Sequence, residues 1–148
     1  MPNDTPVAHR FDGSPIYDNA PTVVCMLASP QFHTDQLIFI RRKSGLFGLP
    51  GGFQMRGETW KQAGVRELYE ETGYLLRPSD IAQFDDVVTD SFGHNLIFAE
   101  AFLDAILDPE ALLDGEALEV LVDDPVGHKA EEWEFPLHFK AVQRWITR

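Results

Sequence analysis

The pattern of apolar and polar positions along the chain predicts strands that alternate with helices. A continuous apolar run at residues 22–28 is typical of a strand that is buried on both faces of a sheet. Shorter apolar runs bounded by turn-forming residues predict further strands. The predicted strands cover residues 22–28, 36–41, 81–89, 95–103 and 118–122. The acidic stretch 104–116 contains a Pro and predicts a loop or a short helix.

Helical spacing is found in two places. Thr59 and Gln62 have the form of a capping box, and Gly73 supplies a residue that can end a helix in the left-handed conformation. Between them an apolar face should pack on the domain, and its members are Val65, Leu68 and Thr72. A second amphipathic helix closes the chain, with Pro136 in its first turn and an apolar face made of Phe135, Phe139, Val142 and Ile146.

These elements predict an α/β protein whose sheet is covered on two faces by helices. We expect one domain over residues 1–148, because no linker or repeat divides the chain. Residues 1–21 are rich in Pro, Asp and Asn, so we expect an irregular segment laid over that domain.

The first of the two helices carries three carboxylates on one side. Glu67, Glu70 and Glu71 stand at i, i+3 and i+4 and fall within an arc of roughly 100°. Because like charges at this spacing repel, the arrangement favours a hard divalent cation with oxygen ligands, Mg²⁺ or Mn²⁺. Arg66 precedes Glu70 by four residues and should hold its carboxylate, and Glu58 places a negative charge at the positive end of the helix dipole.

A phosphate site is predicted next to this helix. Leu49-Pro50-Gly51-Gly52 permits a sharp turn and leaves backbone N–H groups that can approach an anion. The basic run at 41–43 is either a cationic clamp for phosphate oxygens, formed by Arg41 and Arg42, or a solvated strand end. Phe92 either stacks on a base or closes a hairpin.

Residues 52–74 resemble the Nudix box, G-x5-E-x7-R-E-U-x-E-E-x-G-U, in which U is an apolar residue. The matching positions are Gly52, Glu58, Arg66, Glu67, Leu68, Glu70, Glu71, Gly73 and Tyr74, the last being an aromatic where an aliphatic residue is commoner. The resemblance implies an α/β/α sandwich around a mixed sheet. It also implies Mg²⁺-dependent hydrolysis of a nucleoside diphosphate linked to another moiety, with Mn²⁺ as a second candidate cofactor.

The resemblance assigns roles to single positions. The implied metal ligands are Glu67, Glu70, Glu71 and Gly52, and the implied catalytic residues are Glu58, Arg66, Glu70 and Glu71. The substrate contacts predicted beside them are Arg41, Arg42, Gly51, Gly52 and Phe92.

The alternative function is a ligand-sensing domain of the same fold without turnover. The marks of ADP-ribose-cleaving and dinucleoside-polyphosphate-cleaving relatives are both missing after the box, so the substrate stays open.

The group that activates water lies outside the box or is one of its glutamates. Glu119 and Glu116 flank the entry to the strand at 118–122, and loop-borne carboxylates are common catalytic groups. Glu100 lies in the middle of the strand at 95–103, where a lone carboxylate is costly unless it is used or paired. We rank Glu119 first, Glu116 second and Glu100 third. An ordinary acidic loop is the alternative for the first two, and a solvated edge strand is the alternative for Glu100.

Composition narrows the function further. With 148 residues, 44% of them hydrophobic, the chain can bury one core, and its net charge of −12 argues against nucleic acid or an anionic membrane as partner. Cys25 is the single cysteine and is expected to be a buried structural thiol, while the five histidines are expected at the surface or in caps. No signal peptide or membrane helix is recognisable, so we expect a cytoplasmic protein that acts on a small molecule, with a homodimer as the candidate assembly.

Overall fold

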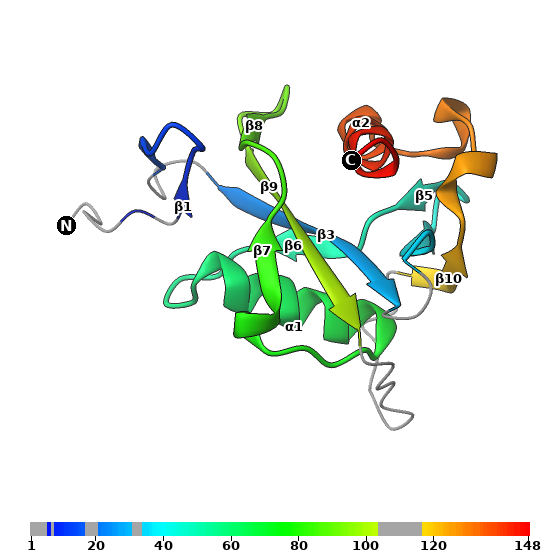
Figure 1. Ribbon diagram of the computed structural model, residues 1–148, viewed down its shortest axis with the longest axis horizontal. Helices are drawn as coiled ribbons and strands as arrows, with labels where there is room; N and C mark the ends of the chain where they lie inside the picture. The colour runs from blue at the N-terminus through cyan, green and yellow to red at the C-terminus, as the bar shows by residue number, and fades with distance from the viewer. Residues whose placement is uncertain (1–5, 7, 17–20, 31–33, 104–116) are drawn as a thin grey trace.

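The computed structural model describes residues 6, 8–16, 21–30, 34–103 and 117–148 (Figure 1). In this part of the chain the α-helices are α1 (Trp60–Thr72) and α2 (Pro136–Ile146), and the 3-10 helices are η1 (Pro78–Asp80), η2 (Pro125–Gly127) and η3 (Ala130–Glu132). The strands are β1 (Ala8–His9), β2 (Pro15–Ile16), β3 (Thr22–Pro30), β4 (Leu37–Arg42), β5 (Phe47–Gly48), β6 (Gly51–Phe53), β7 (Ile81–Gln83), β8 (Val88–Thr89), β9 (Asn95–Leu103) and β10 (Ala117–Asp123).

The main sheet is built around β3. This strand pairs in parallel with β9 over its whole length, from Thr22 with Asn95 to Pro30 with Leu103, and antiparallel with β6 on its other side. β7 and β8 pair antiparallel with β9, and a second antiparallel sheet has the order β10-β4-β5. Parallel and antiparallel pairs therefore coexist, so the predicted mixed sheet is confirmed.

Each face of the sheet is covered by one helix. Side chains of β3 alternate between the two faces, so that Val24 and Met26 pack with Ala63 and Leu68 of α1. Cys25 and Leu27 point the other way and pack with Ala141, Val142 and Trp145 of α2. Figure 1 shows α1 below the strands and α2 above them. The predicted α/β/α sandwich is confirmed.

The termini of α1 are the ones that the sequence indicates. The side-chain oxygen of Thr59 accepts a hydrogen bond from the Gln62 N–H at 3.1 Å, and the Gln62 side chain accepts one from the Thr59 N–H at 2.9 Å. Gly73 ends the helix with a φ of 82°. Leu68 and Thr72 are buried on the face that meets the sheet. The predicted capping box and glycine end are both confirmed.

Two predictions about strands need correction. The single strand expected at 81–89 is divided into β7 and β8, because Asp85 has a φ of 66° and cannot continue an extended ladder. The segment expected to be irregular at 1–21 contains the hairpin β1–β2, which buries Ala8 and Ile16 against the domain. The loop or helix expected at 104–116 lies outside the described residues. Among the helices that are described, none is long and apolar enough to cross a membrane.

Candidate active site

The two glycines before α1 allow β6 to lie close to its neighbours, the backbone of β3 and the side chain of Glu67. Within the predicted turn at 49–52 the chain bends at Pro50, while Gly51 and Gly52 already lie in β6. A Cβ on Gly51 would lie 2.1 Å from the backbone oxygen of Val24, and a Cβ on Gly52 would lie 2.4 Å from Cδ of Glu67. The strand is therefore pressed between β3 and the carboxylate face of α1.

Arg66 gathers the carboxylates at the solvent edge of this contact. Its Nη1 donates to Glu67 Oε1 at 2.9 Å and to Glu70 Oε2 at 3.2 Å. Its Nη2 donates to Glu58 Oε1 at 2.7 Å and to the carbonyl of Phe53 at 3.0 Å. The contact between Arg66 and Glu70 that the i,i+4 spacing predicts is present, and one guanidinium also joins α1 to β6 and to the loop before the helix.

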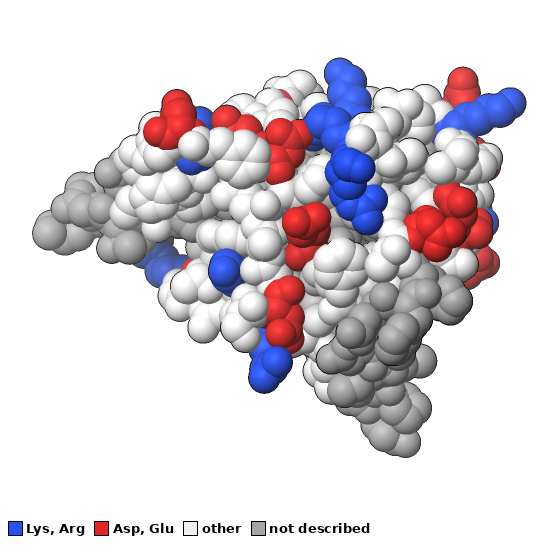
Figure 2. Space-filling view, viewed as in Figure 1, with Lys and Arg blue, Asp and Glu red and all other residues white. Residues whose placement is uncertain are grey.

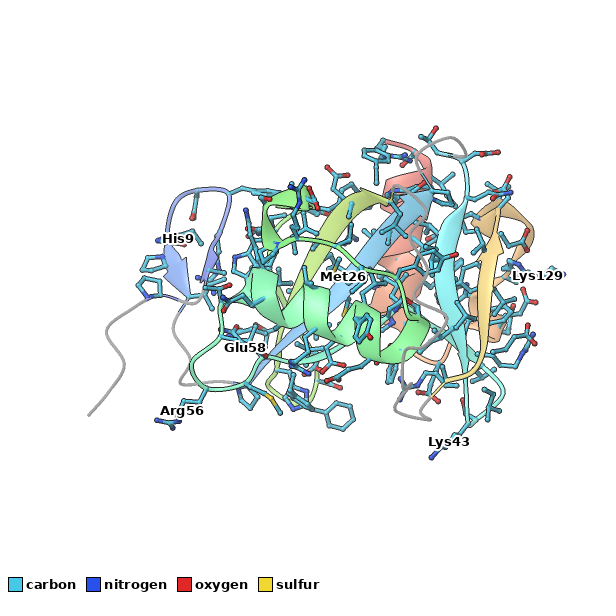
Figure 3. The ribbon with its side chains drawn as sticks, turned by 90° about the horizontal axis from the view of Figure 1, so that it is seen from below. His9, Met26, Lys43, Arg56, Glu58 and Lys129 are labelled. Carbon is cyan, nitrogen blue, oxygen red and sulfur yellow. The ribbon has the colours of Figure 1, made fainter. Side chains whose placement is uncertain are left out.

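This ion-pair network shifts the pKa of its members. The hydrogen bond from Arg66 holds the pKa of Glu58 below its ordinary value of 4.5, and the Met55 N–H contributes in the same direction. The pKa of Arg66 is raised, chiefly by the hydrogen bond to Glu58. In Figure 3, Glu58 lies beside the N-terminal end of α1, where its charge also complements the helix dipole.

Glu71 occupies a different environment from the other two carboxylates on α1. Only 1% of it is exposed, so the surface-facing position expected from the helical arc is wrong for this residue. Its Oε2 accepts a hydrogen bond from the Gly51 N–H at 3.2 Å. That backbone amide, predicted to approach a phosphate, is thus bound to the protein's own carboxylate. Burial of a carboxylate is costly and is offset here by hydrogen bonding.

The residues at this edge fit a hard divalent cation in their donor chemistry. The Glu67 carboxylate fills the space left by the missing Cβ of Gly52, Glu71 contacts the Gly51 N–H, and Glu70 lies beside Arg66, so three carboxylates supply oxygen donors here. In the described part of the chain, however, no three His, Cys, Asp or Glu side chains are grouped in a metal-binding arrangement. The carboxylates of Glu67 and Glu70 are turned towards Arg66, and that of Glu71 towards Gly51. Arg66 contacts one oxygen of each of the first two, Oε1 of Glu67 and Oε2 of Glu70, so its hydrogen bonds do not occupy both oxygens of either carboxylate.

The basic run at 41–43 lies apart from these carboxylates. Arg41 donates to the carbonyl of Gly45 at 3.1 Å, and its Nε lies 3.9 Å from Glu119 Oε2. Arg42 donates to Glu134 Oε2 at 2.5 Å and lines an open pocket with Lys43. Figure 3 shows Lys43 pointing outwards, away from Glu58. The hydrogen bonds and ion pairs described for these arginines go to β10, to the turn after β4 and to Glu134, so the clamp stays a prediction.

The three candidate bases are also dispersed. Glu119 is exposed on β10 and faces Arg41 across the ladder. Glu100 is half-buried on β9, an interior strand between β3 and β7, so the edge strand offered as its alternative is absent. Glu116 lies outside the described residues. The structure does not bring Glu119 or Glu100 into contact with the carboxylates of α1.

Phe92 belongs to a small group of exposed rings. It is 81% exposed, and its ring is stacked at 6.1 Å from that of His94, which meets Phe53 edge-on at 5.1 Å. The turn is fixed by Asp90, which accepts hydrogen bonds from the Phe92 and His94 N–H groups and contacts the His94 ring at 3.1 Å. Phe53 directly follows Gly52 in β6, so the rings continue from the carboxylate edge.

The position of His138 also differs from the one expected from the sequence. It was expected at the surface or in a cap, yet it is only 8% exposed on α2 and lies between Cys25 and Leu49. Its spacing from Phe135 and Val142 places it on the apolar face of that helix, which is the signal that could have indicated its burial. Cys25 is buried as predicted, and burial raises the pKa of its thiol to about 12.

Charge on the surface shows no dominant patch on the face drawn in Figure 2, where acidic and basic side chains are interspersed. The net charge of −12 is therefore not gathered on that face. An anion that binds on this face would therefore be held by individual basic side chains or backbone N–H groups, since the face carries no broad basic patch.

The family model for the NUDIX domain matches residues 18–139. A curated relative, an ADP-ribose pyrophosphatase from Methanocaldococcus jannaschii, is 47% identical over 45 residues. The match covers 28% of this chain and 27% of that relative, so it spans about a quarter of each protein.

Solved structures resemble the fold over most of the chain. A NUDIX hydrolase from Nitrosomonas europaea has a TM-score of 0.70 at 19% identity, covering 87% of this chain and 90% of that one. The second is a bifunctional NMN adenylyltransferase/ADP ribose pyrophosphatase from Francisella tularensis, complexed with AMP and a Mn ion. It has a TM-score of 0.63 at 23% identity, covering 86% of this chain and 41% of the other. At these identities the likeness establishes the fold alone.

Proposed function

The chain belongs to the NUDIX domain family, and from that membership we propose that it is a metal-dependent hydrolase of the pyrophosphate bond in a nucleoside diphosphate linked to another moiety. One observation carries the proposal furthest. Gly52 leaves the space that the Glu67 carboxylate fills, and Arg66 gathers Glu67 and Glu70 beside it. A plain acidic helix needs neither the glycine nor the arginine.

The metal would be held by Glu67, Glu70, Glu71 and the backbone carbonyl of Gly52. Mg²⁺ is the first candidate and Mn²⁺ the second, since carboxylate and carbonyl oxygens suit both. When bound, such an ion neutralises phosphate oxygens and the charge that develops on them during attack by water. The Francisella tularensis protein with a Mn ion supports this assignment by its shared fold.

The chain's own residues would orient the ligands and move a proton. Arg66 holds Glu58 on one side and Glu67 on the other, so it fixes the loop before α1 against the helix. The attacking water gives up a proton to a base while the bond from phosphorus to the bridging oxygen breaks, which releases a nucleoside monophosphate and a second phosphorylated product.

Glu119 stays our first candidate for this base, with its role untested by the geometry. Because it lies on β10 and not on α1, use of Glu119 requires the substrate to reach across to Arg41. We expect Glu119→Gln to remove the acidic limb of the pH profile of kcat at saturating Mg²⁺. An unchanged limb and rate would transfer the role to a glutamate of the helix.

ADP-ribose is the substrate we propose to test first. The 45-residue match to an ADP-ribose pyrophosphatase supports it, and so does the ring group at Phe53, His94 and Phe92, which could take the base. Arg41 and Arg42 are proposed to meet the phosphates only if the substrate extends towards β4. The cytoplasmic location and the homodimer stay predictions.

The decisive experiment is an assay for nucleoside monophosphate release from ADP-ribose, nucleotide sugars and dinucleoside polyphosphates. It is run with Mg²⁺, with Mn²⁺ and with chelator. We expect release only with metal, and a fall in kcat of about 100-fold or more in Glu70→Gln, because a charged ligand is lost. Glu131→Gln, an exposed glutamate on η3, is the control and should keep the wild-type rate. Metal-independent release would contradict the proposal.

The alternative is a ligand-sensing domain without turnover. Calorimetric binding of ADP-ribose with no product after prolonged incubation would favour it over the hydrolase. The three carboxylates on α1 argue for the hydrolase, since a sensor has no need of metal ligands.

A further inference from the structure

The segment that leads into the candidate site is fixed at three consecutive residues. The Leu49 N–H donates to Nδ1 of His138 at 3.1 Å, and the Pro50 carbonyl accepts from the Met26 N–H at 2.7 Å. The Gly51 N–H then donates to Glu71 at 3.2 Å. Two of these anchors come from the sheet and from α1. The third comes from α2, an element that otherwise has no part in the site.

Hydrogen-bond direction determines the tautomer of His138. A backbone N–H can only donate, so Nδ1 must be the unprotonated acceptor, and the proton of the neutral ring is on Nε2. Nε2 lies 3.4 Å from the sulfur of Cys25 and donates to it. Burial lowers the pKa of His138 to about 3, with Arg42 as a smaller cause, so the ring stays neutral at neutral pH.

The surroundings leave the imidazole little freedom. Its ring lies 4.8 Å from the ring of Phe135 and 6.3 Å edge-on from that of Phe98. The neighbouring backbone is equally close, because a Cβ on Gly48 would lie 2.9 Å from Arg42 Cδ and 3.9 Å from His138 Nδ1. A histidine that only filled the core could use any buried hydrogen-bond partner. The partner of His138 is the backbone N–H of Leu49, two residues before Gly51.

We propose that His138 is a positioning residue for the candidate active site, which acts through Leu49 on the segment whose Gly51 N–H binds Glu71. The inference rests on the proposed function, since Glu71 is there a metal ligand. The register supports the connection, because Cys25 pairs with Gly51 in the sheet while its sulfur contacts the same histidine. One imidazole thus joins α2 to β3, the strand beside Gly51, and to the segment between β5 and β6 that leads into Gly51.

Two substitutions separate positioning from packing. Asn at 138 places its amide oxygen near the position of Nδ1 and can still accept from Leu49, whereas Gln extends its amide towards the position of Nε2 and Cys25. We expect Tm to fall by several degrees in both variants, since each loses one buried contact. We expect kcat to fall about tenfold or more in His138→Gln and to stay within about threefold of wild type in His138→Asn, with KM little changed in either. Val142→Ala, a buried change on the same helix, should lower Tm without lowering kcat.

A readout that does not depend on turnover completes the test. Amide hydrogen exchange of Leu49 and Gly51 should accelerate in His138→Gln and stay slow in His138→Asn, and Mn²⁺ affinity should fall only in the former. Equal loss of kcat in both variants, or a loss that follows Tm as it does in Val142→Ala, would overturn the positioning role. If the wild-type protein releases no product, the proposed function fails, while exchange and Mn²⁺ affinity still decide the role of His138.

Discussion

Gly51 and Gly52 are adjacent, but different neighbours require each of them. A side chain at Gly51 would meet the backbone of β3, which cannot move aside, whereas one at Gly52 would meet the end of the Glu67 side chain, which can. The same substitution should therefore have a structural consequence at one position and a functional consequence at the other.

We expect Gly51→Ala to lower the free energy of unfolding by roughly 1–3 kcal/mol or more, because overpacking against backbone forces a strand to shift. Gly52→Ala should leave unfolding nearly unchanged and lower kcat by roughly 10–100-fold, since the carboxylate is displaced. Urea titration and turnover would be measured on both. Gly127→Ala, whose Cβ would meet no atom within 4 Å, is the control. Equal stability loss at 51 and 52 would contradict this reading of the glycines.

Phe92 offers a second prediction at the scale of single residues. If its ring takes a base, Phe92→Ala should raise KM for ADP-ribose by about fivefold or more, because stacking on a base contributes about 1–3 kcal/mol. The thermal stability should hardly change, since the side chain is 81% exposed. Phe102→Ala on β9 is the matched control, because Phe102 is 50% exposed and has no place in the ring group. Equal KM values for the two variants would leave Phe92 as a residue that closes the hairpin.

For single residues, the sequence predicted contacts within one helix, but not how deeply a side chain is buried. The i,i+4 spacing foretold that Arg66 would meet Glu70, because that distance is set within one helix. The burial of Glu71 could not be foreseen, since it depends on how α1 is rotated against β6. The partner of His138 is 89 residues away along the chain, so nothing in its local sequence indicates it.

At the scale of elements, the ion pair between Glu58 and Arg66 ties the loop before α1 to the helix. A carboxylate whose pKa is lowered on folding stabilises the native state above its unfolded pKa, and this contribution is lost as pH falls through the folded value. We expect Glu58→Gln to have a lower Tm than wild type at pH 7, and the difference to shrink as the pH falls below about 4.5. Thermal melts from pH 7 to pH 3 would measure it, with Glu131→Gln as the control. A Tm difference that is constant with pH would exclude the ion pair as its cause.

Element boundaries were predictable where local chemistry sets them. The capping box and Gly73 mark both ends of α1, and Pro136 marks the start of α2, because these signals act within a few residues. The break between β7 and β8 depends on Asp85 in a left-handed conformation. Because this position is not a glycine, the sequence does not indicate that conformation. The hairpin β1–β2 is stabilised by burying Ala8 and Ile16 under the domain, and that is tertiary contact.

For the whole molecule, the carboxylates around Arg66 should make the free energy of unfolding depend on the concentration of a divalent metal. Glu58, Glu67 and Glu70 share a single guanidinium, so negative charge remains in excess at that edge. A cation that binds only the native state stabilises it by about 2.7 kcal/mol at 100 times its Kd. For a chain of this size that corresponds to a rise in Tm of about 5–10 °C.

This rise should appear when Mg²⁺ or Mn²⁺ is titrated to millimolar concentration in a thermal melt. NaCl at matched ionic strength controls for screening, and Glu70→Gln should show a smaller rise because one ligand has lost its charge. A melting temperature that does not respond to either metal beyond the effect of NaCl would count against the site.

The parallel pairing of β3 with β9 has a consequence for how the chain acquires its structure. The two partners flank β4, β5, β6 and α1 in the sequence, so the helix with the carboxylates is complete before β3 can meet its longest neighbour. Folding that depends on such distant pairing is slow, on the order of milliseconds to seconds. During synthesis, β3 exposes one apolar edge until residue 103 has left the ribosome, and an open edge of this kind invites pairing with other chains. Substitutions in β9 should therefore reduce the yield of soluble protein more than their effect on the finished fold alone would suggest.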